Sequence, residues 1–139
     1  MKLSQRTKTE LLSAVPLFAH CSKRDLAAVA KLTTQLELAA GHTLIREDSQ
    51  VAYSFFVLVD GEAEVRRDGR RVATLGPGDF IGELALILRR PRTATVTLTE
   101  PSQLLSISAH NFQPLLMRAP QFQFKLLEAL AERVASASR

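Results

Sequence analysis

The sequence predicts a mainly β domain with flanking helices, in which short antiparallel strands form a sandwich or a barrel. Apolar and polar residues alternate at period two between residues 33 and 109, which is the pattern of half-buried strands. Turn-forming residues interrupt this stretch at intervals of about eight residues, as expected for many short strands. Helical spacing of apolar residues precedes and follows it, over residues 6–32 and 110–139.

Two helices are expected before the strands. Their apolar residues follow helical spacing at Leu11, Leu12, Val15, Leu26, Val29 and Leu32. Pro16 ends the first helix, because proline disfavours helical geometry in the residue before it. Ser22 is the expected N-cap of the second helix, since its hydroxyl oxygen can accept a hydrogen bond from a free backbone N–H.

The strands are expected where apolar residues alternate. These positions are Leu36/Leu38, Leu44, Phe55/Val57/Val59, Ala63/Val65, Val72, Thr95/Thr97 and Leu105/Ile107. The turns between them are expected at Gly41, Asp60-Gly61, Asp68-Gly69 and Gly76-Pro77-Gly78-Asp79. One short helix, from Gly82 to Leu88, is expected to interrupt the strands.

Two helices are expected after the strands. The first starts at Ala109 and carries Phe112, Leu115 and Leu116 on its apolar side. Pro120 begins the second at position N1, where the missing N–H is no loss. A single apolar stripe is expected along this final helix, made of Phe122, Leu126, Leu127, Leu130 and Val134.

Length and composition favour a single soluble domain over residues 1–139. The chain has 46% hydrophobic and 23% charged residues, which excludes global disorder. Its apolar runs are far shorter than the roughly 20 residues that span a bilayer, and its first residues lack the apolar core of a signal peptide. A single cysteine, Cys21, excludes an internal disulfide and suits a reducing compartment. We therefore expect a cytoplasmic location and no transmembrane segment.

The net charge of +4 raises the question of nucleic-acid binding. Two groups of arginines stand out, Arg66/Arg67/Arg70/Arg71 and Arg89/Arg90/Arg92. Tryptophan is absent and Tyr53 is the sole tyrosine, so aromatic residues do not alternate with the basic ones. We expect no helix-turn-helix motif, with its DNA-recognition helix, after the final helix. The sequence therefore predicts no direct nucleic-acid partner.

Residues 82–92 are the strongest functional signal. Gly82 precedes the short helix, whose first backbone N–H groups can bind a phosphate. Glu83 lies in an apolar run, where burying a carboxylate without a partner would be costly. Its oxygens can accept a hydrogen bond from a sugar hydroxyl. Arg92, nine residues later, offers a fork of donors to phosphate oxygens. A sugar and a monoanionic phosphate held together, without a triphosphate loop, indicate a cyclic nucleotide.

The segments Phe80–Leu86 and Pro91–Val96 together resemble the phosphate-binding cassette of the cyclic nucleotide-binding domain family. This family includes catabolite activator proteins, regulatory subunits of cyclic-AMP-dependent kinase and cyclic-nucleotide-gated channels. The resemblance covers nearly the whole chain. It implies an antiparallel β-roll (a double-stranded β-helix or jelly roll), over residues 33–109 with the cassette at 80–96. It also implies N-terminal helices over 6–32, a short cassette helix, and a C-terminal helix pair over 110–139 that includes a lid.

The resemblance implies a role for each cassette residue. Gly82, Leu84 and Ala85 would offer backbone amides to the ligand. Glu83 would accept the ribose 2′-hydroxyl, and Arg92 would pair with the cyclic phosphate. For Glu83, capping of its own helix and an ion pair with Arg92 remain as alternative roles.

Further contacts are implied outside the core of the cassette. Thr93 would offer a hydroxyl to the phosphate or the base, against the alternative of an ordinary strand threonine. Val65, Val72 and Ala73 would line the pocket, against the alternative of plain core residues. Arg133 would cover the purine from the final helix, against the alternative of a solvated side chain.

Two departures from the family pattern concern loops. Asp48 stands where a glycine is frequent, and Leu88-Arg89-Arg90 replaces a loop that is commonly smaller.

The three histidines, His20, His42 and His110, lack the spacing of metal ligands. We expect no metal and no catalytic residue.

The sequence thus predicts a regulatory domain that binds cAMP, with cGMP as the second candidate ligand, and changes conformation on binding. No cofactor besides this ligand is expected, and the domain is not expected to be an enzyme. An effector protein or domain is expected as a partner, and the final helix would allow a homodimer. Two alternatives stay open: a degenerate interaction module that has lost the ligand, and a fragment of a longer channel or transcription regulator.

Overall fold

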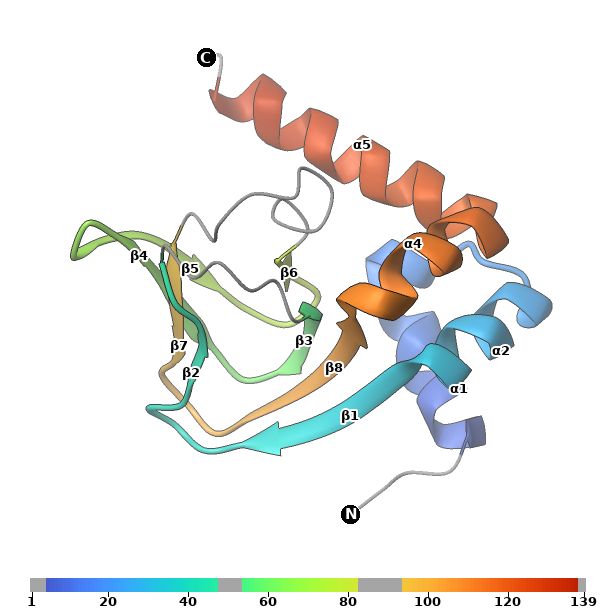
Figure 1. The fold of residues 1–139 in the computed structure, drawn as a ribbon, viewed down its shortest axis with the longest axis horizontal. Coiled ribbons are helices and arrows are strands. Elements are labelled where there is room, and N and C mark those ends of the chain that lie inside the picture. The colour runs from blue at the N-terminus through green and yellow to red at the C-terminus, as the bar shows by residue number, and fades with distance from the viewer. Residues whose placement is uncertain (1–4, 48–53, 83–93, 138–139) are drawn as a thin grey trace. The chain divides into compact units, whose positions relative to one another are not determined.

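A computed structural model describes residues 5–47, 54–82 and 94–137 of the chain. The chain divides into two compact units. The helical unit comprises Met1–Leu32 and Gln113–Arg139, and the strand unit comprises Thr33–Phe112. Figure 1 shows the elements of both units in the order in which the chain visits them.

The helical unit is built from the two ends of the chain. Its elements are α1 (Gln5–Ala14), the 3-10 helix η1 (Pro16–Phe18), α2 (Lys23–Leu32), the later part of α4 (Ala109–Arg118) and α5 (Pro120–Ala137). The rings of Phe18 and Phe122 stack with their centroids 5.0 Å apart, so residues from the two ends share one core. The predicted N-cap of α2 is confirmed, because Ser22 Oγ accepts a hydrogen bond from the Asp25 N–H at 3.1 Å.

Helix α5 carries two apolar faces, so the prediction of a single stripe is wrong. Phe122 and Leu126 are buried, whereas the predicted stripe members Leu127 and Val134 are 64% and 67% exposed. Each residue turns a helix by about 100°, which separates Leu127 from its buried neighbour. Leu127 instead follows the exposed Phe124 at a spacing of three residues and lies on that second face.

The strand unit consists of two four-stranded antiparallel sheets among the described residues. The first sheet has the order β1-β8-β3-β6 and the second the order β2-β7-β4-β5. The strands are β1 (Thr33–Leu38), β2 (Thr43–Ile45), β3 (Ser54–Asp60), β4 (Ala63–Arg67), β5 (Arg70–Leu75), β6 (Phe80–Ile81), β7 (Thr95–Leu98) and β8 (Ser102–Ser108). Each predicted strand is thereby confirmed, and the predicted cassette helix lies outside the described residues.

Residues from both sheets form one buried cluster in the strand unit. Its members are Ile45, Phe56, Leu58, Ala63, Val96, Leu98 and Leu104. They occupy alternate positions of their strands, as the period of two requires. This shared core is what makes the two sheets a β-roll rather than two separate layers.

The alternate residues of β3 and β8 are buried as well. Phe55, Val57, Leu105 and Ile107 are at most 1% exposed. The ring centroid of Phe55 lies 5.6 Å from that of Phe80 in β6. It lies 5.4 Å from that of Phe112 in α4. The contact between Phe55 and Phe80 holds the short strand β6 against β3.

No described helix combines the length and the apolar character needed to cross a bilayer.

Candidate functional site

Gly82 directly follows β6 and has a backbone φ of +98°. Side chains other than hydrogen rarely tolerate this conformation, so the strand can turn here because the residue is glycine. Ile81 and Phe80 pair with Phe56 and Val57 of β3 and hold the backbone up to this point. The cassette therefore starts from a strand anchored in the core.

The turn before β6 adds a second anchor. The Asp79 side chain accepts a hydrogen bond from the Gly76 N–H at 2.8 Å. The backbone N–H of Gly78 donates to the Leu58 carbonyl at 2.7 Å, and the Leu58 N–H donates to the Asp79 carbonyl at 2.8 Å. The predicted Gly-Pro-Gly-Asp turn is confirmed, and it ties the start of β6 to β3.

Five predicted site residues, Glu83, Leu84, Ala85, Arg92 and Thr93, lie outside the described residues. Their roles stay predictions. The chain is described again from Ala94, which is buried, and β7 begins at the next residue.

The predicted apolar lining lies on neighbouring strands of one sheet. Val65 of β4 pairs with Ala73 of β5 on one side and with Val96 of β7 on the other. Between the pairs Val65↔Ala73 and Arg66↔Arg71, β4 advances by one residue and β5 by two. Val72 is therefore the extra residue of a β-bulge, which bends the strand locally.

Val65, Val72 and Ala73 differ in how far their side chains are exposed to solvent. Val65 is half-buried and packs against the cluster between the sheets. Val72 is 51% exposed, and Ala73 is exposed too. The alternative that all three are core residues is therefore wrong for Val72 and Ala73. The β4–β5 hairpin presents an accessible apolar surface next to the core.

Arg133 is an exposed residue of α5 in the helical unit, whereas Gly82 and the apolar lining belong to the strand unit. The structure brings Val65, Val72 and Ala73 together. For Arg133 it gives an exposed position on the final helix, and the lid role stays a prediction.

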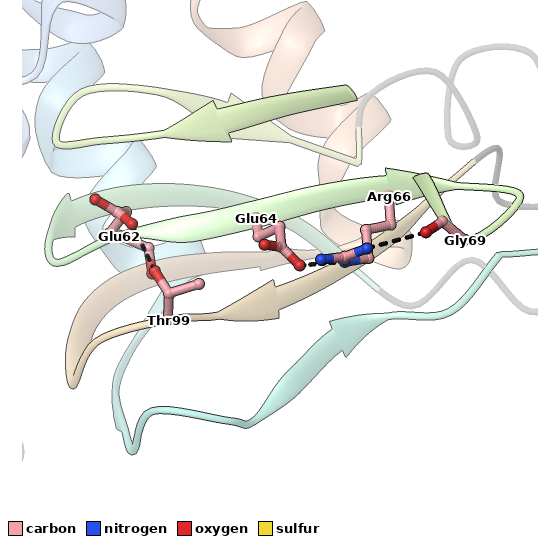
Figure 2. A network of polar contacts seen from close by, with 5 residues as sticks. All are labelled: Glu62, Glu64, Arg66, Gly69 and Thr99. Atoms are coloured by element: carbon pink, nitrogen blue, oxygen red, sulfur yellow. Dashed lines mark hydrogen bonds and ion pairs between the residues drawn. The ribbon is translucent and has the colours of Figure 1, made fainter. Parts of the chain in front are cut away.

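Polar side chains lie along β4, an inner strand of the second sheet, and just beyond its two ends (Figure 2). Arg66 forms an ion pair with Glu64 and donates from Nη1 to the Gly69 carbonyl at 2.9 Å. At the other end of β4, Thr99 Oγ1 donates to Glu62 Oε1 at 2.8 Å. These contacts fix the two ends of β4, the strand that carries Val65.

Glu47 is a residue of this region that the sequence pattern did not single out. Its backbone N–H donates to Thr95 Oγ1 at 2.9 Å, and its Oε1 accepts from the Asp68 N–H at 3.0 Å. These partners lie 48 and 21 residues away in the sequence, so no local spacing could have revealed them.

Other described groups offer no competing chemistry. No three His, Cys, Asp or Glu side chains among the described residues are placed to hold a metal. Burial, and next the nearby charge of Asp25, raise the pKa of the Cys21 thiol. A raised pKa keeps the thiol protonated at neutral pH, which is the opposite of what a nucleophile needs. An open hollow of about 430 Å³ beside Glu37, Asp60 and Gln103 contains none of the described site residues.

Comparison with known proteins identifies the family and the fold. Residues 35–119, more than half of the chain, match the family described as cyclic nucleotide-binding domain. The structure superimposes on that of cAMP-bound PfPKA-R with a TM-score of 0.76 and 25% sequence identity, over 90% of this chain and 47% of that one. The predicted β-roll is thereby confirmed.

Two curated relatives are similar in sequence. The Pycsar effector protein PaPycTIR of Pseudomonas aeruginosa is 35% identical over 113 residues, which is 80% of this chain and 36% of that protein. The cyclic nucleotide-gated potassium channel RHE_CH03180 of Rhizobium etli is 32% identical over 124 residues, which is 89% of this chain and 34% of that protein. The chain thus spans about a third of the length of these relatives.

Proposed function

The chain belongs to the cyclic nucleotide-binding domain family, and from this premise we propose that it is a regulatory domain controlled by cAMP. The observation that carries the proposal is Gly82, which has a φ of +98°, directly follows the anchored strand β6 and immediately precedes the sequence Glu83-Leu84-Ala85. A backbone that turns sharply into a helix start exposes amide donors, and such donors bind a phosphate.

In this proposal the phosphate and the sugar are recognised by different groups. Gly82, Leu84 and Ala85 supply backbone amides, and Arg92 supplies a charged fork of donors to the cyclic phosphate. Glu83 accepts the hydrogen bond of the ribose 2′-hydroxyl. Each group meets the part of the ligand whose charge or hydrogen-bonding character complements its own.

The base would contact mainly apolar surface. Val65 and Ala73 lie side by side on paired strands, and Val72 is exposed on the same hairpin. Thr93 would contact the base or the phosphate, and Arg133 would cover the purine. We propose cAMP as the principal ligand and cGMP as the second candidate, in line with the similarity to the cAMP-bound PfPKA-R structure.

The proposed output is a conformational change without catalysis by this domain. A ligand that binds a closed form more tightly than an open one shifts the population toward the closed form by that difference in free energy. The chain spans about a third of the length of the two relatives compared. The regulated activity is therefore proposed to reside in further sequence or in a partner protein. A cytoplasmic location, a homodimer and the absence of direct nucleic-acid contact belong to the same proposal.

Calorimetric titration with cAMP and cGMP tests this proposal on the wild type and on Arg92→Ala. Removing one partner of a buried charge pair costs about 2 kcal/mol or more, so cAMP binding should weaken at least about thirtyfold. Arg24→Ala is the matched control, because Arg24 is an exposed arginine of α2, away from the cassette and the β4–β5 hairpin in the sequence. It should bind as the wild type does.

Absence of measurable binding of both nucleotides to the wild type would contradict the proposal and favour the degenerate interaction module. Equal affinity of the wild type and Arg92→Ala would instead contradict the role of Arg92.

A further inference from the structure

Glu47 joins three segments of the strand unit that are far apart in the sequence. It lies two residues after the end of β2 and is half-buried. Its backbone N–H donates to Thr95 Oγ1 at the start of β7, and its carboxylate accepts from the Asp68 N–H in the β4–β5 turn. One residue thus bonds to a strand start with its backbone and to a hairpin tip with its side chain.

The contact with the Glu47 side chain lies at the exposed tip of the β4–β5 hairpin. Asp68 has a φ of +53° and Gly69 one of +77°, which is the combination that a tight two-residue turn requires. Aspartate tolerates this left-handed conformation better than most residues, but the conformation is still less favourable for it than for glycine. A hydrogen bond from the Asp68 N–H to a charged oxygen is stronger than one to a neutral acceptor and stabilises this geometry.

The tip determines where the apolar lining lies. Turn geometry fixes the pairing register of a hairpin, and a slip by one residue would turn every side chain to the other face. In this hairpin the extra residue, Val72, stands only three positions after Gly69 and next to the pair Val65↔Ala73. A loosened tip would therefore displace the bulge and the residues beside it.

The other partner of Glu47 belongs to the neighbouring strand. Thr95 pairs with Arg66 of β4, and Val96 pairs with Val65. The hydrogen bond from Glu47 holds the first residue of β7 at the same end of the sheet as the hairpin tip. The tip of the hairpin and the start of β7 are thereby fixed relative to each other.

We propose that Glu47 is a positioning residue for the nucleotide site, acting through Asp68 and Thr95 on the apolar lining rather than by touching the ligand. This inference rests on the proposed function. Loss of the Glu47 side chain is therefore expected to weaken ligand binding more than an equal loss of thermal stability at another place in the strand unit would.

The test compares three variants by calorimetric titration with cAMP, at a temperature where thermal melting shows each to be fully folded. Glu47→Ala should bind cAMP about tenfold more weakly, the size expected from loss of one charge-assisted hydrogen bond. Glu47→Gln keeps an acceptor oxygen and should stay within about threefold of the wild type. Thr95→Val removes the second contact without touching Glu47 and should weaken binding in the same direction as Glu47→Ala.

Glu62→Ala is the matched control. Glu62 is also half-buried and also accepts a side-chain hydrogen bond, from Thr99 at the other end of β4. Its loss should lower the melting temperature as much as that of Glu47 and leave cAMP affinity unchanged. Hydrogen exchange at the Asp68 amide adds a local readout, with protection lost in Glu47→Ala and kept in Glu47→Gln.

Wild-type affinity in Glu47→Ala, with the wild type binding cAMP, would overturn this inference alone. Equal loss of affinity in Glu47→Ala and Glu62→Ala would also overturn it, since the effect would then be general destabilisation. Failure of the wild type to bind any cyclic nucleotide would overturn the proposed function and this inference with it.

Discussion

Gly61, in the turn between β3 and β4, shows how closely two backbone segments approach each other. It has a φ of +109°, and a β-carbon at this position would lie 2.8 Å from Ser102 Cα and closer still to the Ser102 side chain. Neighbouring backbone cannot move aside as a flexible side chain can. The residue is therefore restricted to glycine by its conformation and also by the space around it.

Gly61→Ala should destabilise the domain by about 3 kcal/mol or more, because it adds a backbone clash to the strain of a positive φ. Gly41→Ala separates these two effects, since Gly41 has a φ of +88° and nothing within 4 Å of its would-be β-carbon. It should cost only about 1–2 kcal/mol. Urea unfolding measures both values, and equal losses would contradict the proposed clash.

At the scale of the element, β6 and α5 illustrate two kinds of positioning. Strand β6 has only two residues, yet it is held by pairing with β3 and by the contact of Phe80 with Phe55. Helix α5 has 18 residues and buries only one of its two apolar faces among the described elements. Burial, not length, decides how firmly each element is held.

Leu126 and Leu127 of α5 provide a matched test of the two faces. Leu126 is 2% exposed and Leu127 is 64% exposed. Leu126→Ala should cost about 2–5 kcal/mol of unfolding free energy, because it leaves a cavity in the core. Leu127→Ala should stay within about 0.5 kcal/mol, as surface substitutions usually do. Urea unfolding at several protein concentrations measures both, and a large, concentration-dependent loss in Leu127→Ala would instead indicate that this face is covered in a homodimer.

The whole molecule combines a strand unit with a helical unit formed by both ends of the chain. Gly82 and the apolar lining belong to the strand unit, and Arg133 belongs to the helical unit. A nucleotide that binds only the folded chain stabilises it by mass action. The expectation of one domain over residues 1–139 therefore becomes testable through ligand-dependent unfolding.

At a cAMP concentration of about one hundred times its Kd, unfolding should become less favourable by about 2.7 kcal/mol, which corresponds to a rise in melting temperature of about 10 °C. Adenosine 5′-monophosphate is the control, because it has the same base and sugar but an open phosphate of higher charge. Thermal melting followed by circular dichroism measures both ligands. One transition that moves as a whole would support a single cooperative domain, whereas two transitions of which one moves would contradict it.

The sequence alone predicted the positions of the strands and the turns between them because these depend on local chemistry. Period-two alternation marked β3 and β8, and the Asp68-Gly69 pair marked a hairpin whose left-handed backbone the structure confirms. It also located Gly82 at the end of a strand. It failed for Leu127 and Val134, because an apolar residue near a helical stripe does not reveal which face the rest of the chain covers.

The sequence by itself therefore determined the family and the order of the described elements, since each depends on residues close together in the chain, and it supplied a cassette chemistry that stays a prediction. Only the tertiary structure decided that Val72 is the extra residue of a bulge, that Ala73 is exposed, and that Glu47 bonds to both Asp68 and Thr95. Register, burial and hydrogen bonds between distant segments arise when strands pair in space. No pattern along a single stretch of chain contains that information.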